Sequence, residues 1–147
     1  MTVSFNDDLD LFKIAESGQC FRWIRVKDVP PAVYRIIAGG RVLFMDFDGK
    51  TLDLSCNKED YDGFWRPYLD EGTSYKRIRK LIDSDRDEFL FGAAASGKGI
   101  RILRQDPFET LISFIISQRK NIPAIRASIE RLCTLAGKRI ELSGEEI

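Results

Sequence analysis

The sequence has no histidine among its 147 residues, and its three cysteines lie far apart with no CxxC pair. Neither a zinc site nor a disulfide framework is indicated, and histidine-based acid/base chemistry is excluded. No apolar run approaches the roughly 20 residues that a membrane-spanning helix needs. Residues 1–12 are acidic, with no basic segment leading into an apolar stretch, so we expect a cytoplasmic protein with no secretory signal.

The chain also lacks a net charge, but its positive and negative residues are segregated along the sequence. Residues 1–62 hold 8 Lys and Arg against 11 Asp and Glu, whereas residues 98–139 hold 9 against 3. A basic segment in a neutral chain is either a solvated helix face or the footprint of a phosphate backbone. Composition alone leaves both interpretations open.

Alternation of apolar and polar residues predicts four strands between residues 21 and 56. The segments are FRWIRV (21–26), AVYRIIA (32–38), GRVLFMDF (40–47) and KTLDLSC (50–56). The pairs Gly39-Gly40 and Asp48-Gly49 are hairpin signals between the later segments. We therefore expect an antiparallel meander with one covered face, in a domain of the α+β class.

After Asn57 the apolar residues follow helical spacing, which predicts helical segments at 58–70, 74–83 and 86–96. Two apolar stripes result, and both are expected to face the core. They are Tyr61, Phe64, Trp65 and Tyr68 in the first segment, and Ile78, Leu81 and Ile82 in the second.

A third helical region has the clearest start in the chain. In QDPFETLISFIISQ, Asp106 is a cap, Pro107 takes the first helical position and Glu109 completes a capping box. Residues Leu111 to Ile116 are apolar almost all round, which predicts a helix buried inside a domain. A second helix, about 122–135, follows with Asn121 as its cap. Its predicted apolar face is Ile122, Ile125, Ile129 and Leu132.

The stretch GAAASGK (92–98) has the GxxxxGK spacing of a phosphate-binding loop. However, Gly99 stands where such a loop needs Ser or Thr for Mg²⁺, and the stretch follows a helical pattern instead of a buried strand. No nucleotide, other organic cofactor or metal is therefore expected.

Two other stretches carry the functional signal. SGQCFRW (17–23) reads simply as a glycine turn followed by a strand, and the polar string Ser117 to Asn121 reads simply as a linker between two helices. Taken together with FWRPYLD, GIRILRQDPFE and IERLC, in this order along the chain, they resemble the 8-oxoguanine DNA glycosylases of base excision repair. The resemblance runs over nearly the whole chain.

The resemblance implies an N-terminal α+β domain with a twisted antiparallel sheet like that of the TATA-binding protein, at residues 1–104. The first helices of an all-α glycosylase domain would follow at residues 105–147. The partner would be double-stranded DNA containing 8-oxoguanine, whose damaged base is flipped into a pocket between the domains. A bacterial member would be associated with the nucleoid.

The resemblance also assigns roles to residues. The carbonyl of Gly18 would accept a hydrogen bond from N7–H of 8-oxoguanine, whereas guanine offers an acceptor at that position. Ser117, Gln118, Arg119 and Asn121 would fill the gap left by the flipped base and contact the orphaned base, while Lys120 and Arg126 would contact phosphates. Ala124 stands where eukaryotic members have an arginine, so a relaxed choice of opposite base is expected.

The family's catalytic lysine, its aspartate and the Leu-Pro-Gly-x-Gly hairpin have no match in the chain. We therefore expect an N-terminal portion of a glycosylase/AP lyase, inactive by itself, whose partner is the missing C-terminal half. The alternative is a non-catalytic, stand-alone module for DNA binding or protein docking.

Overall fold

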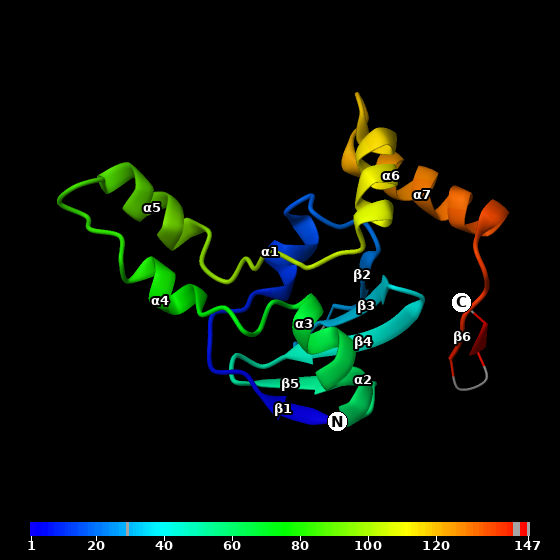
Figure 1. Ribbon diagram of the computed structural model, residues 1–147, viewed down its shortest axis with the longest axis horizontal. Helices are drawn as coiled ribbons and strands as arrows, with labels where there is room; N and C mark the ends of the chain where they lie inside the picture. The colour runs from blue at the N-terminus through cyan, green and yellow to red at the C-terminus, as the bar shows by residue number, and fades with distance from the viewer. Residues whose placement is uncertain (29, 143–144, 147) are drawn as a thin grey trace.

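Five strands form one antiparallel sheet in the computed structural model, which describes residues 1–28, 30–142 and 145–146 (Figure 1). The strand order is β1-β5-β4-β3-β2. The strands are β1 (Thr2–Ser4), β2 (Trp23–Lys27), β3 (Val33–Ala38), β4 (Arg41–Phe47) and β5 (Thr51–Leu54). The predicted meander and the α+β class are confirmed. Strand β1 was missed, because three residues are too few to show an alternating pattern.

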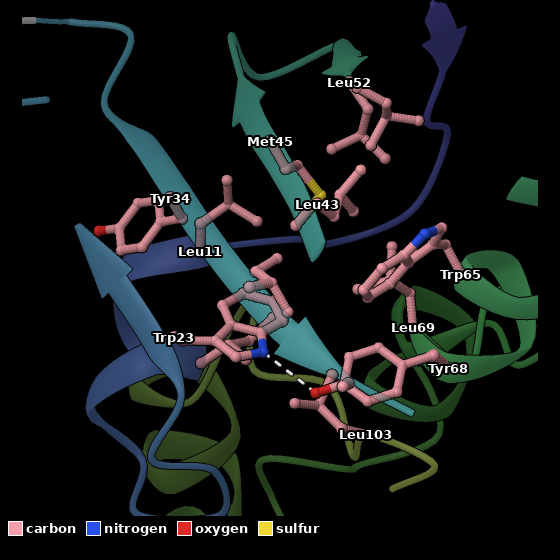
Figure 2. Close-up of a cluster of buried hydrophobic side chains, with 14 of the residues drawn as sticks. Leu11, Trp23, Tyr34, Leu43, Met45, Leu52, Trp65, Tyr68, Leu69 and Leu103 are labelled. Atoms are coloured by element: carbon pink, nitrogen blue, oxygen red, sulfur yellow. Dashed lines mark hydrogen bonds between the residues drawn. The ribbon is translucent and has the colours of Figure 1, made fainter. Parts of the chain in front are cut away.

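One face of the sheet carries the core (Figure 2). Alternate residues of the strands point into it, and they are almost fully buried: Trp23, Tyr34, Ile36, Leu43, Met45, Leu52 and Leu54. Two helical segments complete this core, namely α1 (Leu11–Glu16) and the run α2 (Lys58–Asp60), η1 (Tyr61–Trp65) and α3 (Arg66–Tyr68).

The first predicted aromatic stripe is confirmed as part of this core. Tyr61, Trp65 and Tyr68 are buried, and Phe64 packs against them half-buried. The indole N–H of Trp23 donates a hydrogen bond to the Tyr68 hydroxyl over 3.1 Å, so the polar atoms of two buried aromatics satisfy each other (Figure 2).

The second predicted stripe was wrong. Helices α4 (Tyr75–Arg79) and α5 (Glu88–Ser96) project away from the sheet, and they pack on each other (Figure 1). Ile78 and Leu81 are therefore exposed, although Ile82 is half-buried. Helical spacing identifies which residues share a face, but it does not say what that face meets.

The next two helices, α6 (Pro107–Ser117) and α7 (Ile122–Ala136), begin where the capping signals place them. The Asp106 carboxylate accepts from the Glu109 backbone N–H, and the Asn121 amide oxygen accepts from that of Ala124. Ile125 and Ile129 of the predicted α7 face are buried, while Leu132 is largely exposed. Beyond α7, β6 (Glu141–Leu142) pairs with β7 (Glu145–Glu146).

The expectation that α6 is buried was also wrong. It packs on α7, but Phe108, Leu111, Phe114 and Ile115 are each more than half exposed. The described residues therefore supply only part of the surroundings that this apolar helix needs. Neither α6 nor any other helix in the described ranges combines the length and apolar character needed to cross a bilayer.

The extended segment 97–105 connects α5 to α6, and its central side chain, Arg101, is fully buried. The Arg101 guanidinium donates to the carbonyls of Leu69 (2.9 Å), Asp70 (2.6 Å) and Thr73 (2.8 Å), and also to that of Asp8 (3.1 Å). It lies 3.6 Å from the Asp7 carboxylate and 4.4 Å from the centre of the Tyr75 ring. The positive charge of Arg101 is thus compensated by the dipoles of these carbonyls and by the Asp7 carboxylate, as the burial of a charge requires.

We expect Arg101→Met to lower the free energy of unfolding by about 3–5 kcal/mol, because it leaves the carbonyls and Asp7 without their buried partner. Urea denaturation of the purified chain measures this. Arg86→Met is the matched control, since the Arg86 side chain is 88% exposed, and we expect it to change stability by less than about 0.5 kcal/mol. Equal, small effects of the two substitutions would contradict the anchoring role of Arg101.

Candidate nucleic-acid interface

The turn that contains Gly18 follows directly from the end of α1. Ser17 caps the helix, and Gly18 adopts φ +78°, the left-handed conformation that commonly ends helices. No protein atom lies within 4 Å of the position that a Cβ on Gly18 would take, whereas a Cβ on Gly99 would lie 2.5 Å from the Cβ of Asp10. Gly18 is thus required by its turn and not by crowding, and the space outside it is open.

Cys20 anchors the far side of this turn in the core. It is buried, and its thiol lies 3.9 Å from the Ile14 carbonyl as a weak donor. Burial raises the pKa of the Cys20 thiol to about 12. The thiol is therefore a packing group and not a nucleophile at neutral pH.

The loop Ser117–Asn121 joins α6 to α7 at the end of α6, and Gln118 to Asn121 are exposed. Several of its side chains fold back onto their own helices. The Ser117 hydroxyl and the Gln118 amide both donate to the Phe114 carbonyl, and the Lys120 ammonium donates to the Ser128 hydroxyl. These bonds fix the shape of the loop while leaving its outer surface free.

Arg119 is the exception within the loop. Its φ is +57°, a left-handed conformation that costs a residue with a Cβ roughly 1–2 kcal/mol. Its side chain forms no hydrogen bond or ion pair with any residue that the structure describes. A strained backbone that presents an uncommitted guanidinium to solvent is typical of a binding position.

Arg126, predicted from the family resemblance to contact phosphate, is directed inward. Its guanidinium donates to the Ala15 carbonyl over 3.2 Å and to the Glu16 carboxylate over 3.1 Å. These contacts tie the first turns of α7 to the last turn of α1, immediately before the Gly18 turn. The two predicted recognition segments therefore belong to neighbouring, connected elements.

A second ion pair joins α7 to the sheet. Arg22 donates to the Glu130 carboxylate over 2.9 Å, and both residues line a groove of about 780 Å³ between the β3–β4 turn and the end of α7. Glu109 of α6 lines the same groove. Burial raises the pKa of Glu109, and the nearby positive charge of Arg22 partly opposes that change.

The described residues contain no group of three or more His, Cys, Asp or Glu side chains placed to hold a metal ion. Burial also raises the pKa of Tyr68, as it does that of Cys20, so neither group is activated. The chemistry offered at the surface is that of the cationic and amide side chains of the 117–121 loop.

Comparisons with known proteins identify the family and the fold. The family described as 8-oxoguanine DNA glycosylase, N-terminal domain, matches residues 2–111. The chain belongs to the 8-oxoguanine DNA glycosylase family. The N-glycosylase/DNA lyase of Saccharomyces cerevisiae is 29% identical over 148 aligned residues, which cover 90% of this chain and 38% of the yeast protein.

Two solved structures of this family show the same fold. MBOgg1, in complex with a low-affinity DNA ligand, is 39% identical with a TM-score of 0.88, covering 99% of this chain and 49% of that one. The Clostridium acetobutylicum 8-oxoguanine glycosylase/lyase, bound to double-stranded DNA with cytosine opposite 8-oxoG, is 35% identical with a TM-score of 0.83, covering 99% and 52%. The chain thus spans about half the length of these glycosylases.

Sequence reasoning found the Gly18 turn and the 117–121 loop, but it missed what holds them. The ion pairs Arg22–Glu130 and Arg126–Glu16 join residues more than 100 positions apart, so no local pattern marks them. The left-handed backbone of Arg119 also carries no sequence signal, because Gly or Asn would normally mark such a position.

We expect Arg119→Gly to raise the free energy of unfolding by about 0.5–1 kcal/mol, since relief of the left-handed strain exceeds the added entropy of glycine in the unfolded chain. The neighbouring control, Lys120→Gly, has no left-handed strain to relieve, and we expect it to destabilise by a similar amount. Chemical denaturation of both variants measures the difference. A loss of stability in Arg119→Gly would show that the loop does not hold Arg119 in this conformation.

Proposed function

We propose that the chain is the lesion-recognition half of an 8-oxoguanine DNA glycosylase/AP lyase, which binds duplex DNA and helps to flip the oxidised base. The observation that carries this proposal is the loop Ser117–Asn121. It combines a fixed backbone with an exposed, uncommitted Arg119 at the end of α6, in a chain of the glycosylase family. A long cationic side chain in that position is suited to enter the duplex where a base has left.

The Gly18 turn is the proposed wall of the base pocket. A carbonyl there would accept a hydrogen bond from N7–H of 8-oxoguanine and would face the lone pair of N7 in guanine. One such mispaired contact is worth on the order of 1–3 kcal/mol, or roughly tenfold to a hundredfold in discrimination. The open space outside Gly18 is consistent with a base approaching the backbone.

The exposed face of α6 supports the other half of the proposal. Phe108, Leu111 and Phe114 present a row of apolar side chains that a stable monomer rarely leaves in water. We propose that the C-terminal half of the glycosylase, which supplies the catalytic lysine and aspartate, covers this face. A stand-alone docking module, whose partner would cover the same face, is the weaker alternative, because two solved structures that the chain matches are 8-oxoguanine glycosylases in complex with DNA.

Binding to duplex DNA is the first test. We expect weak, salt-dependent affinity. Arg119→Ala and Lys120→Ala should each weaken binding, and Lys120→Ala should also reduce the slope of log K against log salt concentration by about 1, since it removes one phosphate contact. Lys50→Ala, in the β4–β5 turn, is the control and should leave the slope unchanged. Fluorescence anisotropy over a salt series measures all four proteins. Salt-independent binding would show that the basic segment, residues 98–139, is a solvated helix face and not a phosphate-binding surface.

Lesion recognition is tested in a chimaera, in which this chain replaces the matching half of the Clostridium acetobutylicum glycosylase/lyase. We expect Gly18→Ala to slow excision of 8-oxoguanine about tenfold or more, with a much smaller change in affinity for an abasic duplex, which places no base against the turn. Single-turnover excision and binding assays give the two values. Equal losses on both substrates, together with a lower melting temperature, would leave Gly18 as a structural turn only.

A further inference from the structure

The side chain of Gln19, directly after Gly18, pairs with the connecting segment as a neighbouring strand would. Its amide N–H₂ donates to the Arg101 carbonyl over 2.9 Å, and its amide oxygen accepts from the Leu103 backbone N–H over 2.9 Å. The other amide hydrogen is directed to the Ser17 hydroxyl at 3.0 Å. One side chain thus satisfies two backbone groups of an extended segment that pairs with no strand among the described residues.

Gln105 makes the reciprocal contact. Its side-chain amide donates to the backbone carbonyl of Gln19, 86 residues earlier in the chain. Each glutamine therefore bonds to the segment that contains the other. Gln19 lies in the Gly18 turn, and Gln105 is the last residue before Asp106, the cap of α6. We refer to this pair of residues, Gln19 and Gln105, as the glutamine clamp.

The glutamine clamp connects the Gly18 turn to the start of α6, and it can therefore set the position of both proposed recognition segments. One end is bonded to the turn that contains Gly18, and the other directly precedes α6. That helix has 11 residues and extends roughly 16 Å. Because a helix is rigid over this length, the position of its first residue determines the position of the Ser117–Asn121 loop at its other end. Base flipping needs the pocket wall and the gap-filling side chain at a fixed separation, and displacements of about 1 Å are costly in such sites.

We propose that Gln19 and Gln105 are positioning residues that set the placement of the 117–121 loop relative to the Gly18 turn. Their importance for DNA rests on the proposed function, but the positioning itself is a property of the free chain. The alternative anchors are the ion pairs of Arg126 and Arg22, which are partly exposed and therefore weaker restraints.

The test is a distance distribution between two spin labels in the intact chain, one at Phe12 on α1 and one at the exposed Ala124 in the first turn of α7, directly after the loop. Both positions are exposed, and Cys56→Ser and Cys133→Ser remove the two half-buried thiols while the buried Cys20 stays. We expect Gln19→Met, similar in length but unable to make the hydrogen bonds, to widen the distribution at least twofold. Ile36→Val is the matched control, because it weakens the core without touching the clamp.

A second variant separates hydrogen bonding from packing. In Gln19→Glu the neutral carboxyl group can donate to the Arg101 carbonyl and accept from the Leu103 N–H, as the amide does, whereas the carboxylate repels that carbonyl. We expect a narrower distribution at pH 4 than at pH 8, because an ordinary Glu pKa of about 4.3 leaves much of the carboxyl group neutral at pH 4 and almost none of it at pH 8. The charged groups that act on the neighbouring Cys20 are Glu16, Glu109 and Arg126, and the parent chain with Gln19, measured at both pH values, controls for their titration.

A Gln19→Met distribution as narrow as that of the parent would overturn the proposal, as would widening that appears in Arg126→Met but not in Gln19→Met. Widening in Ile36→Val as large as in Gln19→Met would also overturn it, because general destabilisation would then explain the result. Failure of the proposed function gives a different result, since a chain that does not bind DNA can still show the clamp-dependent distances.

Discussion

The structure depends on the connecting segment, residues 97–105, and on the buried Arg101 guanidinium at its centre. Arg101 joins chain positions that lie far apart, because the carbonyls it binds belong to the loop before α1 and to the turn after α3. The same segment is bonded through Leu103 to Gln19 on one side and through Arg104 to Tyr68 on the other. This one connecting segment therefore holds together the sheet, the Gly18 turn and the start of α6.

This dependence explains how the two proposed recognition segments are combined. The Gly18 turn belongs to the sheet domain by its position after α1, while the 117–121 loop belongs to the helices. Neither is long or apolar enough to hold the other by direct packing. Hydrogen bonds to the connecting segment, with the ion pairs of Arg22 and Arg126, supply the link that the hydrophobic core does not. The boundary predicted at residues 104 and 105 falls within this linked region and stays a prediction.

The sequence predicted those features that depend on local chemistry. Strand alternation, the paired glycines and the caps Asp106 and Asn121 each act within a few residues, so their patterns are visible in one dimension. Whether a helix face is covered depends on the rest of the molecule, and this is why the expected burial of Ile78 and of α6 was wrong. The burial of Arg101 could not be predicted for the same reason. In the sequence an arginine is expected at the surface, and only the folded chain shows the carbonyls that it binds. The roles of the site residues came from resemblance to a family, not from residue patterns.

The environment of Cys20 has a consequence for durability. Sulfur is oxidised by peroxide chiefly as the thiolate, and burial, which raises the pKa of the Cys20 thiol to about 12, keeps the thiolate scarce at pH 7. Cys20 is two residues from Gly18, so a sulfenic or sulfonic group there would expand the core beneath the turn and displace it. By burying this sulfur, the fold lowers the reactivity of the thiol beneath the turn toward peroxide.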